Sequence, residues 1–416
     1  MIACALPAGA DSGGLVSQGR ETLSQWQIAP FHLGAAIGPM GGGALPIIFA
    51  ILMGAFEVDR ATLSLALPAY MFPYAAVQLI SGSISDLTSR RSSILLGFSA
   101  YGACTMLAGL SWSFEVFILA QVLQGATNAF TTPLLMATLG DVMPAERTGR
   151  TMGMFSTLNM AGASGAPLLA GLLAGTSWRL VYIVVALIAW SLTVWYFFWF
   201  RKYGHLVPNR PRAATFRADL GRIWQAMGLT LLLLASLSFL ANGALRGPSY
   251  LFAEFMRETW GTGVGFSGVA LGMYGIAGLV LGPFAGLAIE RLGIFKGATI
   301  SMGGIAAALV LLGLAPGEFS FAAGNFLLGG FGIAAWASLN TLVVQAMPTH
   351  RGTASSIFGS TKFLAQAVSP IWFTPLYDTV DPVMIFYVAA FMAVLLILPL
   401  TLLRGRLGPD MSAPTA

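Results

Sequence analysis

Long apolar runs separated by short polar loops dominate the chain, and the runs are continuous rather than alternating, as in LTLLLLASLSFLA at 229–241. An α-helix satisfies its own backbone hydrogen bonds in lipid, and about 20 apolar residues span the hydrocarbon core. The pattern therefore predicts an all-α membrane protein with twelve transmembrane helices. They are expected near 30–52, 62–85, 92–111, 114–140, 150–174, 178–200, 224–249, 262–289, 295–315, 318–346, 352–376 and 380–403.

Composition supports this interpretation and excludes several other classes. Of the 416 residues, 56% are hydrophobic and only 9% are charged, against about 25% charged in soluble domains. Two cysteines, Cys4 and Cys104, are too few for a disulfide scaffold, and the apolar content excludes a disordered chain. The first basic residue is Arg20, so no cleaved signal peptide is expected at the N-terminus.

The loop charges predict the orientation. With a cytoplasmic N-terminus, most of the 21 basic residues fall in cytoplasmic loops, whereas Arg60, Arg179 and Arg257 fall outside. The positive-inside rule therefore predicts that both termini are cytoplasmic. The expected organisation is a cytoplasmic tail (1–29), a six-helix bundle (30–200), a central cytoplasmic loop (201–223), a second six-helix bundle (224–403) and a cytoplasmic tail (404–416).

The two halves also repeat one another in sequence. A single offset of 204 residues places Gly82 on Gly286, Asp86 on Glu290, Gly125 on Gly329, Pro144 on Pro348 and Arg147 on Arg351. Internal repeats of this kind are common in transporters. The offset predicts two pseudo-symmetric bundles.

The duplicated loop motif resembles the major facilitator superfamily (MFS). The first copy, GSISDLTSRRSS, keeps Gly82, Asp86, Arg90 and Arg91 of the family pattern but has Leu87 and Ser89 where Arg and Gly are usual. The second copy, GLAIERLGIFK, keeps an acid and basic residues. Its motif residues are Gly286, Glu290, Arg291, Gly293 and Lys296. The resemblance covers nearly the whole chain through the repeat and implies the MFS fold.

This motif is expected to act as a gating latch. Carboxylates at Asp86 and Glu290 can pair with arginines or a helix N-terminus of the other half only while the cytoplasmic side is closed. The alternative is that these charges only set topology. We favour the latch because an acid recurs in both copies. The expected gating residues are Gly82, Asp86, Arg90, Arg91, Gly286, Glu290 and Arg291.

Two further segments resemble 12-span drug:proton antiporters. The fourth expected span has Gln121 where many family members carry an arginine linked to proton coupling. The fifth span resembles the antiporter signature through Gly153, Gly162, Pro167 and Gly171, with two glycines replaced by alanine. Export follows from this resemblance, not from the physics of the residues.

A stripe of glycines marks one face of the eighth expected span. The positions are 261, 265, 268, 272, 275, 282 and 286, which keep to one helix face. Such a smooth ridge suits close packing against another helix. The fifth span is the partner that the resemblance implies, either for rocking or for static packing.

Charge inside the spans gives the main indication of the substrate. Lys362 lies near the middle of the eleventh span and Arg246 near the outer end of the seventh, with no acid at comparable depth. Ionisable groups in the membrane are costly and are functional candidates. Lys362 could bind an anionic substrate, handle protons, or simply bond backbone carbonyls in a wet cleft. The expected substrate-binding residues are Lys362, Arg246, Gln124, Asn128, Asn242, Trp336 and Asn340.

These observations predict a secondary active transporter that exports a small amphipathic or anionic organic molecule in exchange for protons. Proton-coupled uptake or exchange of an organic anion is the alternative, and a non-transporting receptor is a third hypothesis. We expect no enzyme activity, catalytic residue, metal or cofactor. The expected partners are the lipid bilayer, the small-molecule substrate and protons, without nucleic acid. A monomer in the bacterial inner (plasma) membrane is expected.

Overall fold

The computed structural model describes residues 23–207, 228–347 and 351–407, and every regular element in these ranges is a helix. The N-terminal half contains α1 (Ala29–Gly43), α2 (Leu45–Phe56), α3 (Arg60–Ser64), α4 (Ala66–Leu87), α5 (Arg90–Leu110), α6 (Phe114–Asn128), α7 (Thr132–Val142), α8 (Ala145–Leu173), α9 (Trp178–Tyr203) and η1 (Gly204–Leu206). The C-terminal half contains α11 (Leu229–Arg246), η2 (Pro248–Leu251), α12 (Phe252–Trp260), α13 (Val264–Leu292), α14 (Ile294–Gly313), α15 (Glu318–Ala346), α16 (Arg351–Val368), α17 (Pro370–Thr379), α18 (Met384–Leu395) and α19 (Ile397–Leu407).

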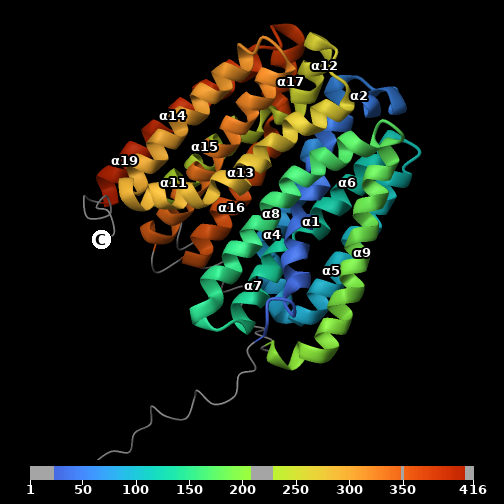
Figure 1. Ribbon diagram of the computed structural model, residues 1–416, viewed down its shortest axis with the longest axis vertical. Coiled ribbons are helices and arrows are strands. Elements are labelled where there is room, and N and C mark those ends of the chain that lie inside the picture. Colours follow the sequence, from blue (N-terminus) through green and yellow to red (C-terminus); the bar gives the residue numbers. More distant parts are fainter. Residues whose placement is uncertain (1–22, 208–227, 348–350, 408–416) are drawn as a thin grey trace, which may run out of the picture.

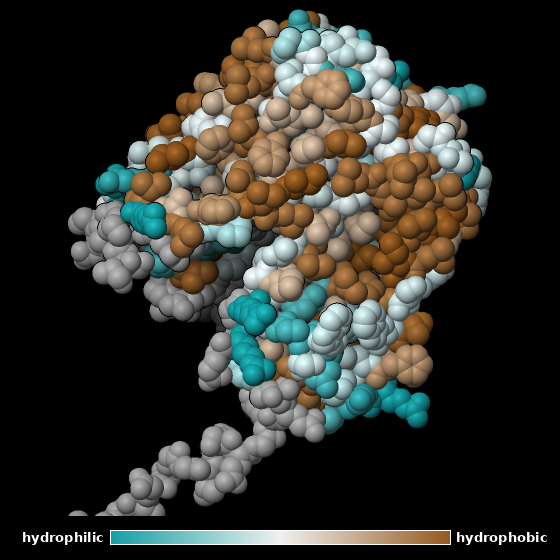
Figure 2. All heavy atoms as spheres, in the orientation of Figure 1, coloured by the Kyte–Doolittle hydropathy of each residue, from teal (hydrophilic) through white to brown (hydrophobic). Residues whose placement is uncertain are grey.

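Many of these helices can cross a membrane. Among the described residues, eight helices are long and apolar enough, or nine when α1 and α2, bent by 41°, are taken as one span. Large apolar side chains stand exposed on their flanks, including Phe198, Leu232, Phe284 and Ile371. Figure 2 shows this apolar surface in brown along the helices, with hydrophilic residues toward the ends. Soluble monomers rarely expose so much apolar surface, so the flanks are suited to lipid.

Several expected spans are interrupted where the pattern predicted one continuous helix. The breaks lie at or just before a proline: Pro46 follows the α1–α2 break, Pro133 the α6–α7 break, and Pro370 the α16–α17 break. Proline lacks a backbone N–H and its ring clashes with the preceding turn. The apolar pattern alone does not distinguish a broken span from a straight one.

The helices gather into two halves that lie side by side, with α1–α9 in blue to green and α11–α19 in yellow to red (Figure 1). At one end, here called the basic end, α5 and α14 begin and α9 and α19 finish. This end carries Arg90, Arg91, Arg201, Lys202, Lys296, Arg404 and Arg406. The opposite end, where α3 begins and α12 finishes, is called the Arg60 end.

The predicted repeat is confirmed in the packing of the two halves. A Cβ on Gly125 of α6 would lie 2.0 Å from the carbonyl oxygen of Tyr70 in α4. A Cβ on Gly329 of α15 would lie 2.1 Å from the carbonyl oxygen of Tyr274 in α13. Both pairs are related by the offset of 204 residues found in the sequence. The same glycine therefore allows the same close helix contact in each half.

Candidate functional site

The two halves meet along α8 and α13, where the glycine stripe lies. A Cβ on Gly268 would be 2.5 Å from the Pro167 carbonyl oxygen and 2.8 Å from the Gly171 Cα. A Cβ on Gly275 would be 2.1 Å from the Ser164 hydroxyl oxygen. The fifth expected span is therefore confirmed as the partner of the stripe. The small residues let the two backbones touch.

The stripe is shorter at both ends than the sequence predicts. Gly261 does not belong to it, because it ends α12 in the left-handed conformation (φ 67°), which glycine adopts easily. Toward the basic end, Gly278 is the last stripe glycine at which a Cβ would meet α8, at 3.2 Å from the Met160 sulfur. A Cβ on Gly286 or Gly153 would meet nothing within 4 Å. The two halves therefore separate toward the basic end, and Figure 2 shows the surface notched between them there.

The remaining antiporter-like positions pack α8 within its own half. A Cβ on Gly162 would lie 2.2 Å from the Ala36 carbonyl oxygen, so this glycine holds α8 against α1. Asn159, one turn before it, donates to the Ala35 carbonyl (2.9 Å). Gly162 thus packs against α1, while Pro167 and Gly171 pack against α13.

Lys362 lies on α16, next to aromatic rings instead of a carboxylate. Its Nζ is 4.5 Å from the ring centroid of Trp336 on α15 and 4.4 Å from that of Phe363. The side chain is partly exposed. The negative faces of aromatic rings attract cations, more strongly where water is scarce. The rings therefore stabilise the ammonium, and no carboxylate of the described residues neutralises its positive charge.

Arg246 ends α11 and has a similar environment. Its guanidinium carbon lies 4.3 Å from the ring centroid of Tyr274 on α13. The residue is partly exposed, and its positive charge repels that of Lys362. Within the described residues, neither cation has a carboxylate partner. The C-terminal half therefore holds two positive charges, Lys362 and Arg246, that no carboxylate of the described residues neutralises.

The expected polar residues of the N-terminal half are buried and bonded to their neighbours. Gln124 donates to Thr105 (2.8 Å). Asn128 donates to the Tyr70 hydroxyl (2.6 Å) and to the Gly38 carbonyl (3.1 Å). Their amide nitrogens hold α6 against α1, α4 and α5. These contacts are typical of polar groups that join membrane helices.

In the C-terminal half, the expected amides bond within their own helices. Asn242 is buried and donates to the Ser238 carbonyl (3.0 Å). Asn340 is partly exposed and donates to the backbone carbonyl of Trp336 (2.8 Å), the residue whose ring faces Lys362. Asn340 thus lies one turn after Trp336 on α15, and its hydrogen bond is to the backbone and not to the ring.

The expected gating residues lie at the basic end, where the halves are apart. Gly82 and Asp86 are near the end of α4, and Glu290 and Arg291 near the end of α13. The side chains of Asp86 and Glu290 fall outside the described part of the structure. Arg90 pairs with Asp141 of α7 (2.5 Å), which is a contact within the N-terminal half. Arg91 and Arg291 are exposed.

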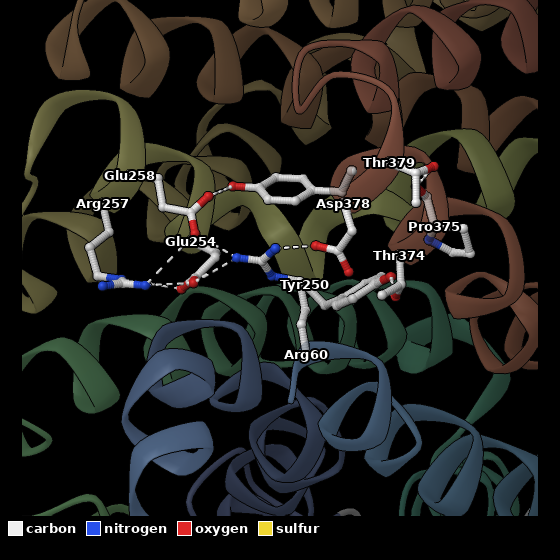
Figure 3. Close-up of polar contacts among 10 residues, drawn as sticks. Arg60, Tyr250, Glu254, Arg257, Glu258, Thr374, Pro375, Asp378 and Thr379 are labelled. Carbon is white, nitrogen blue, oxygen red and sulfur yellow. Dashed lines mark hydrogen bonds and ion pairs between the residues drawn. The ribbon is translucent and has the colours of Figure 1, made fainter. Parts of the chain in front are cut away.

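One cluster of charged residues was not predicted from the sequence. Arg60 of α3 pairs with Glu254 and Glu258 of α12 and with Asp378 of α17 (Figure 3). The partners lie 194 to 318 residues from Arg60 in sequence. The signal available was weak: opposite charges at the outer ends of different expected spans.

Comparison with known proteins assigns the family. The family model of the Major Facilitator Superfamily matches residues 31–252 and 231–416. A drug efflux pump, JefA, of Mycobacterium tuberculosis is 31% identical over 156 residues, which cover 36% of this chain and 30% of the pump. An uncharacterised MFS-type transporter, YceJ, of Bacillus subtilis is 26% identical over 85% of this chain and 90% of its own length.

A solved structure, that of a D-xylose–proton symporter, has the same fold. It superposes with a TM-score of 0.73 at 14% identity and covers 90% of this chain and 96% of the symporter. The duplicated motif, the repeated glycine contacts and the family match over nearly the whole chain agree with one another. The chain therefore belongs to the Major Facilitator Superfamily of membrane transporters.

Proposed function

We propose that this protein is a secondary active transporter that exports small organic anions, including amphipathic ones, in exchange for protons. The observation that carries the proposal is the pair of partly exposed cations, Lys362 and Arg246, which face aromatic rings and have no carboxylate partner among the described residues. A carboxylate or sulfonate on the substrate would neutralise them. The aromatic rings would pack against an apolar part of the same molecule.

We further propose that the chain forms twelve spans in two six-helix bundles, 30–200 and 224–403, with both termini in the cytoplasm. The charges of the basic end support this orientation. The central site would then be open to the cytoplasm and closed toward the outside. Rocking of the bundles about the α8–α13 contact would expose it alternately to each side. We place the monomer in the bacterial inner membrane.

In this scheme the motif residues at the basic end act when that end closes. Asp86 and Glu290 would then meet arginines or helix ends of the opposite half. The open notch between the halves supports an unlatched state for the present conformation. Export as the direction is supported by the drug efflux relative and by the antiporter-like residues of α8.

Transport in inverted membrane vesicles tests the proposal. Carboxylated, neutral and quaternary ammonium dyes of similar size are supplied, with and without an imposed pH gradient. We expect gradient-dependent accumulation of the carboxylated dye, strongly reduced in Lys362→Gln and partly kept in Lys362→Arg. Lys202→Gln is the matched control, since Lys202 lies over Tyr203 at the end of α9, away from the site.

Three outcomes would contradict parts of the proposal. Equal transport of all dyes by wild type and Lys362→Gln would remove the recognition role of Lys362. Accumulation only in right-side-out vesicles would favour uptake of an organic anion, the alternative direction. Accumulation without a pH gradient would exclude proton coupling.

A further inference from the structure

At the Arg60 end, one arginine from the N-terminal half forms ion pairs with carboxylates of the C-terminal half. Arg60 Nη2 lies 3.2 Å from Glu254 Oε1 and 2.5 Å from Glu258 Oε1, and its Nη1 contacts Asp378 (Figure 3). Two further sets of ion pairs, Arg90–Asp141 and Arg257 with Glu254 and Glu258, each lie within one half. The three ion pairs of Arg60 instead join the two halves.

Local structure fixes Arg60 in this position. Asp59 caps α3 by accepting a hydrogen bond from the Thr62 amide (2.9 Å), so Arg60 is the first residue of a defined helical turn. The guanidinium carbon lies 4.5 Å from the ring centroid of Tyr377. The Tyr377 hydroxyl in turn donates to Glu258 Oε2 (2.7 Å). The arginine is therefore oriented by a ring as well as by its ion pairs.

Without Arg60, the three carboxylates of this cluster carry more negative charge than the remaining arginine, Arg257, can neutralise. Arg257 donates to Glu254 at 2.6 and 3.2 Å and lies 4.0 Å from Glu258. The titratable groups around Arg60 are thus Glu254, Glu258, Arg257, Tyr377 and Asp378, with Tyr250 bonded to Thr374 below them. While the halves are together, the three carboxylates are paired with two arginines, Arg60 and Arg257. Once the halves separate, Arg60 moves away and only Arg257 remains beside them. Opening this end therefore leaves excess negative charge on the C-terminal half.

Part of the cluster is withdrawn from solvent. The side chain of Arg60 is 18% exposed and that of Glu254 only 1%, whereas those of Glu258 (39%) and Asp378 (32%) reach water. Charge pairs that are partly withdrawn from water are screened by salt less than exposed pairs are. Removing one member of such a group leaves the others unpaired, which costs more than the loss of a surface ion pair.

We propose that Arg60 is a clasp that holds the Arg60 end of the transporter closed, and that protons reaching this end loosen it. Protonation of Glu254, Glu258 or Asp378 removes the negative charge that Arg60 pairs with, so acid favours the open state. The inference rests on alternating access between the two halves and is independent of the substrate. It adds a second gate, opposite the duplicated motif.

Distance measurements across this gate test the clasp. Ala61 on α3 and Thr379 on α17 are exposed, and these two helices are in contact. Spin labels on Ala61→Cys and Thr379→Cys, in a Cys4→Ser/Cys104→Ser background, report the separation by pulsed electron spin resonance. We expect mostly short distances with Arg60, and at least a threefold rise in the long-to-short ratio in Arg60→Gln.

The control and the rescue make the result specific. Arg179 lies outside the cluster and contacts the Ser111 carbonyl (3.1 Å) and the Trp178 ring within its own half. Arg179→Gln should leave the distances unchanged, and Arg60→Lys, which keeps the positive charge beside all three carboxylates, should recover much of the short population. If Arg60→Gln is poorly folded, Asp378→Asn should shift the distances in the same direction.

A pH series completes the test. Lowering the pH from about 7.5 to about 4, the range in which carboxylates take up protons, should raise the long-to-short ratio with Arg60 but not in Arg60→Gln. Unchanged distances in both Arg60→Gln and Asp378→Asn, on monodisperse protein, would overturn the clasp. An equal pH effect without Arg60 would overturn the proton part. Neither result depends on transport, so failure of the clasp is distinct from failure of the proposed export.

Discussion

The ring of Tyr74 on α4 meets the ring of Phe363 on α16 edge to face, with centroids 4.2 Å apart. Phe363 is also one of the two rings that face the Lys362 ammonium. One aromatic side chain therefore contacts both the opposite half and the cation of the proposed site. Movement of α4 against α16 would change the environment of Lys362, which gives substrate charge and conformation a direct physical connection.

Trp336 should be needed for binding an anion at Lys362. Trp336→Leu removes the ring that holds the ammonium, which is worth about 0.5–2 kcal/mol, or roughly a 2- to 30-fold loss of affinity. We expect a raised KM for the carboxylated dye in Trp336→Leu and a smaller rise in Trp336→Phe. An unchanged KM in both variants would show that the ring has no part in recognition.

Gly268 should tolerate no side chain, whereas Gly265 on the same helix should. A Cβ at Gly268 meets backbone of α8 at 2.5 and 2.8 Å, and one at Gly265 comes no closer than 3.9 Å. Overpacking of this kind typically costs about 1–3 kcal/mol. We expect Gly268→Ala to lower the thermal unfolding temperature and the transport rate, and Gly265→Ala to behave like wild type. Similar behaviour of the two variants would contradict the geometry of the α8–α13 contact.

The repeat predicts two equivalent sensitive positions. Gly125→Ala and Gly329→Ala each place a methyl group about 2 Å from a carbonyl oxygen of the neighbouring helix, so both should be destabilised by at least about 1–3 kcal/mol. Gly54→Ala is the control, because a Cβ there meets nothing within 4 Å. Thermal unfolding in detergent compares the three variants. A large loss in one half only would argue against equivalent packing.

Asp59 should stabilise the turn that presents Arg60. Its hydrogen bonds with Thr62 lower the pKa of the carboxyl below 3.8. A carboxyl with a lowered pKa stabilises the folded turn above its unfolded pKa, and this contribution is lost as the pH falls through the lowered value. The cap should therefore be intact throughout pH 5–8. We expect faster amide exchange in α3 for Asp59→Ala across this range, and near-normal exchange for Asp59→Asn, which can still accept the hydrogen bond.

Features that depend on local periodicity could be predicted from the sequence. The apolar runs predicted the positions of the helices. The spacing of glycines predicted a packing face from Gly265 to Gly275, and the resemblance to the MFS implied that α8 is its partner. The offset of 204 residues predicted matching contacts at Gly125 and Gly329.

Features that depend on distant pairing could not be predicted. The Arg60 cluster joins α3, α12 and α17, and only the folded chain brings these together. The hydrogen bonds from the amide nitrogens of Gln124 and Asn128 to Thr105 and Tyr70 join different helices, and a sequence does not reveal such partners. Gly261 fitted the helical spacing, although a left-handed helix end places it outside α13.

The backbone contact between α8 and α13 lies closer to the Arg60 end than to the basic end. Beyond Gly278, α13 continues to Leu292 alongside α14 and α15 of its own half, a length of about 21 Å at 1.5 Å per residue. A lever with so long an arm converts a rotation of about 10° at the fulcrum into a displacement of about 4 Å at its tip. A small rotation at the α8–α13 glycine contact is therefore enough to open the basic end to solutes while the contact itself stays nearly unchanged.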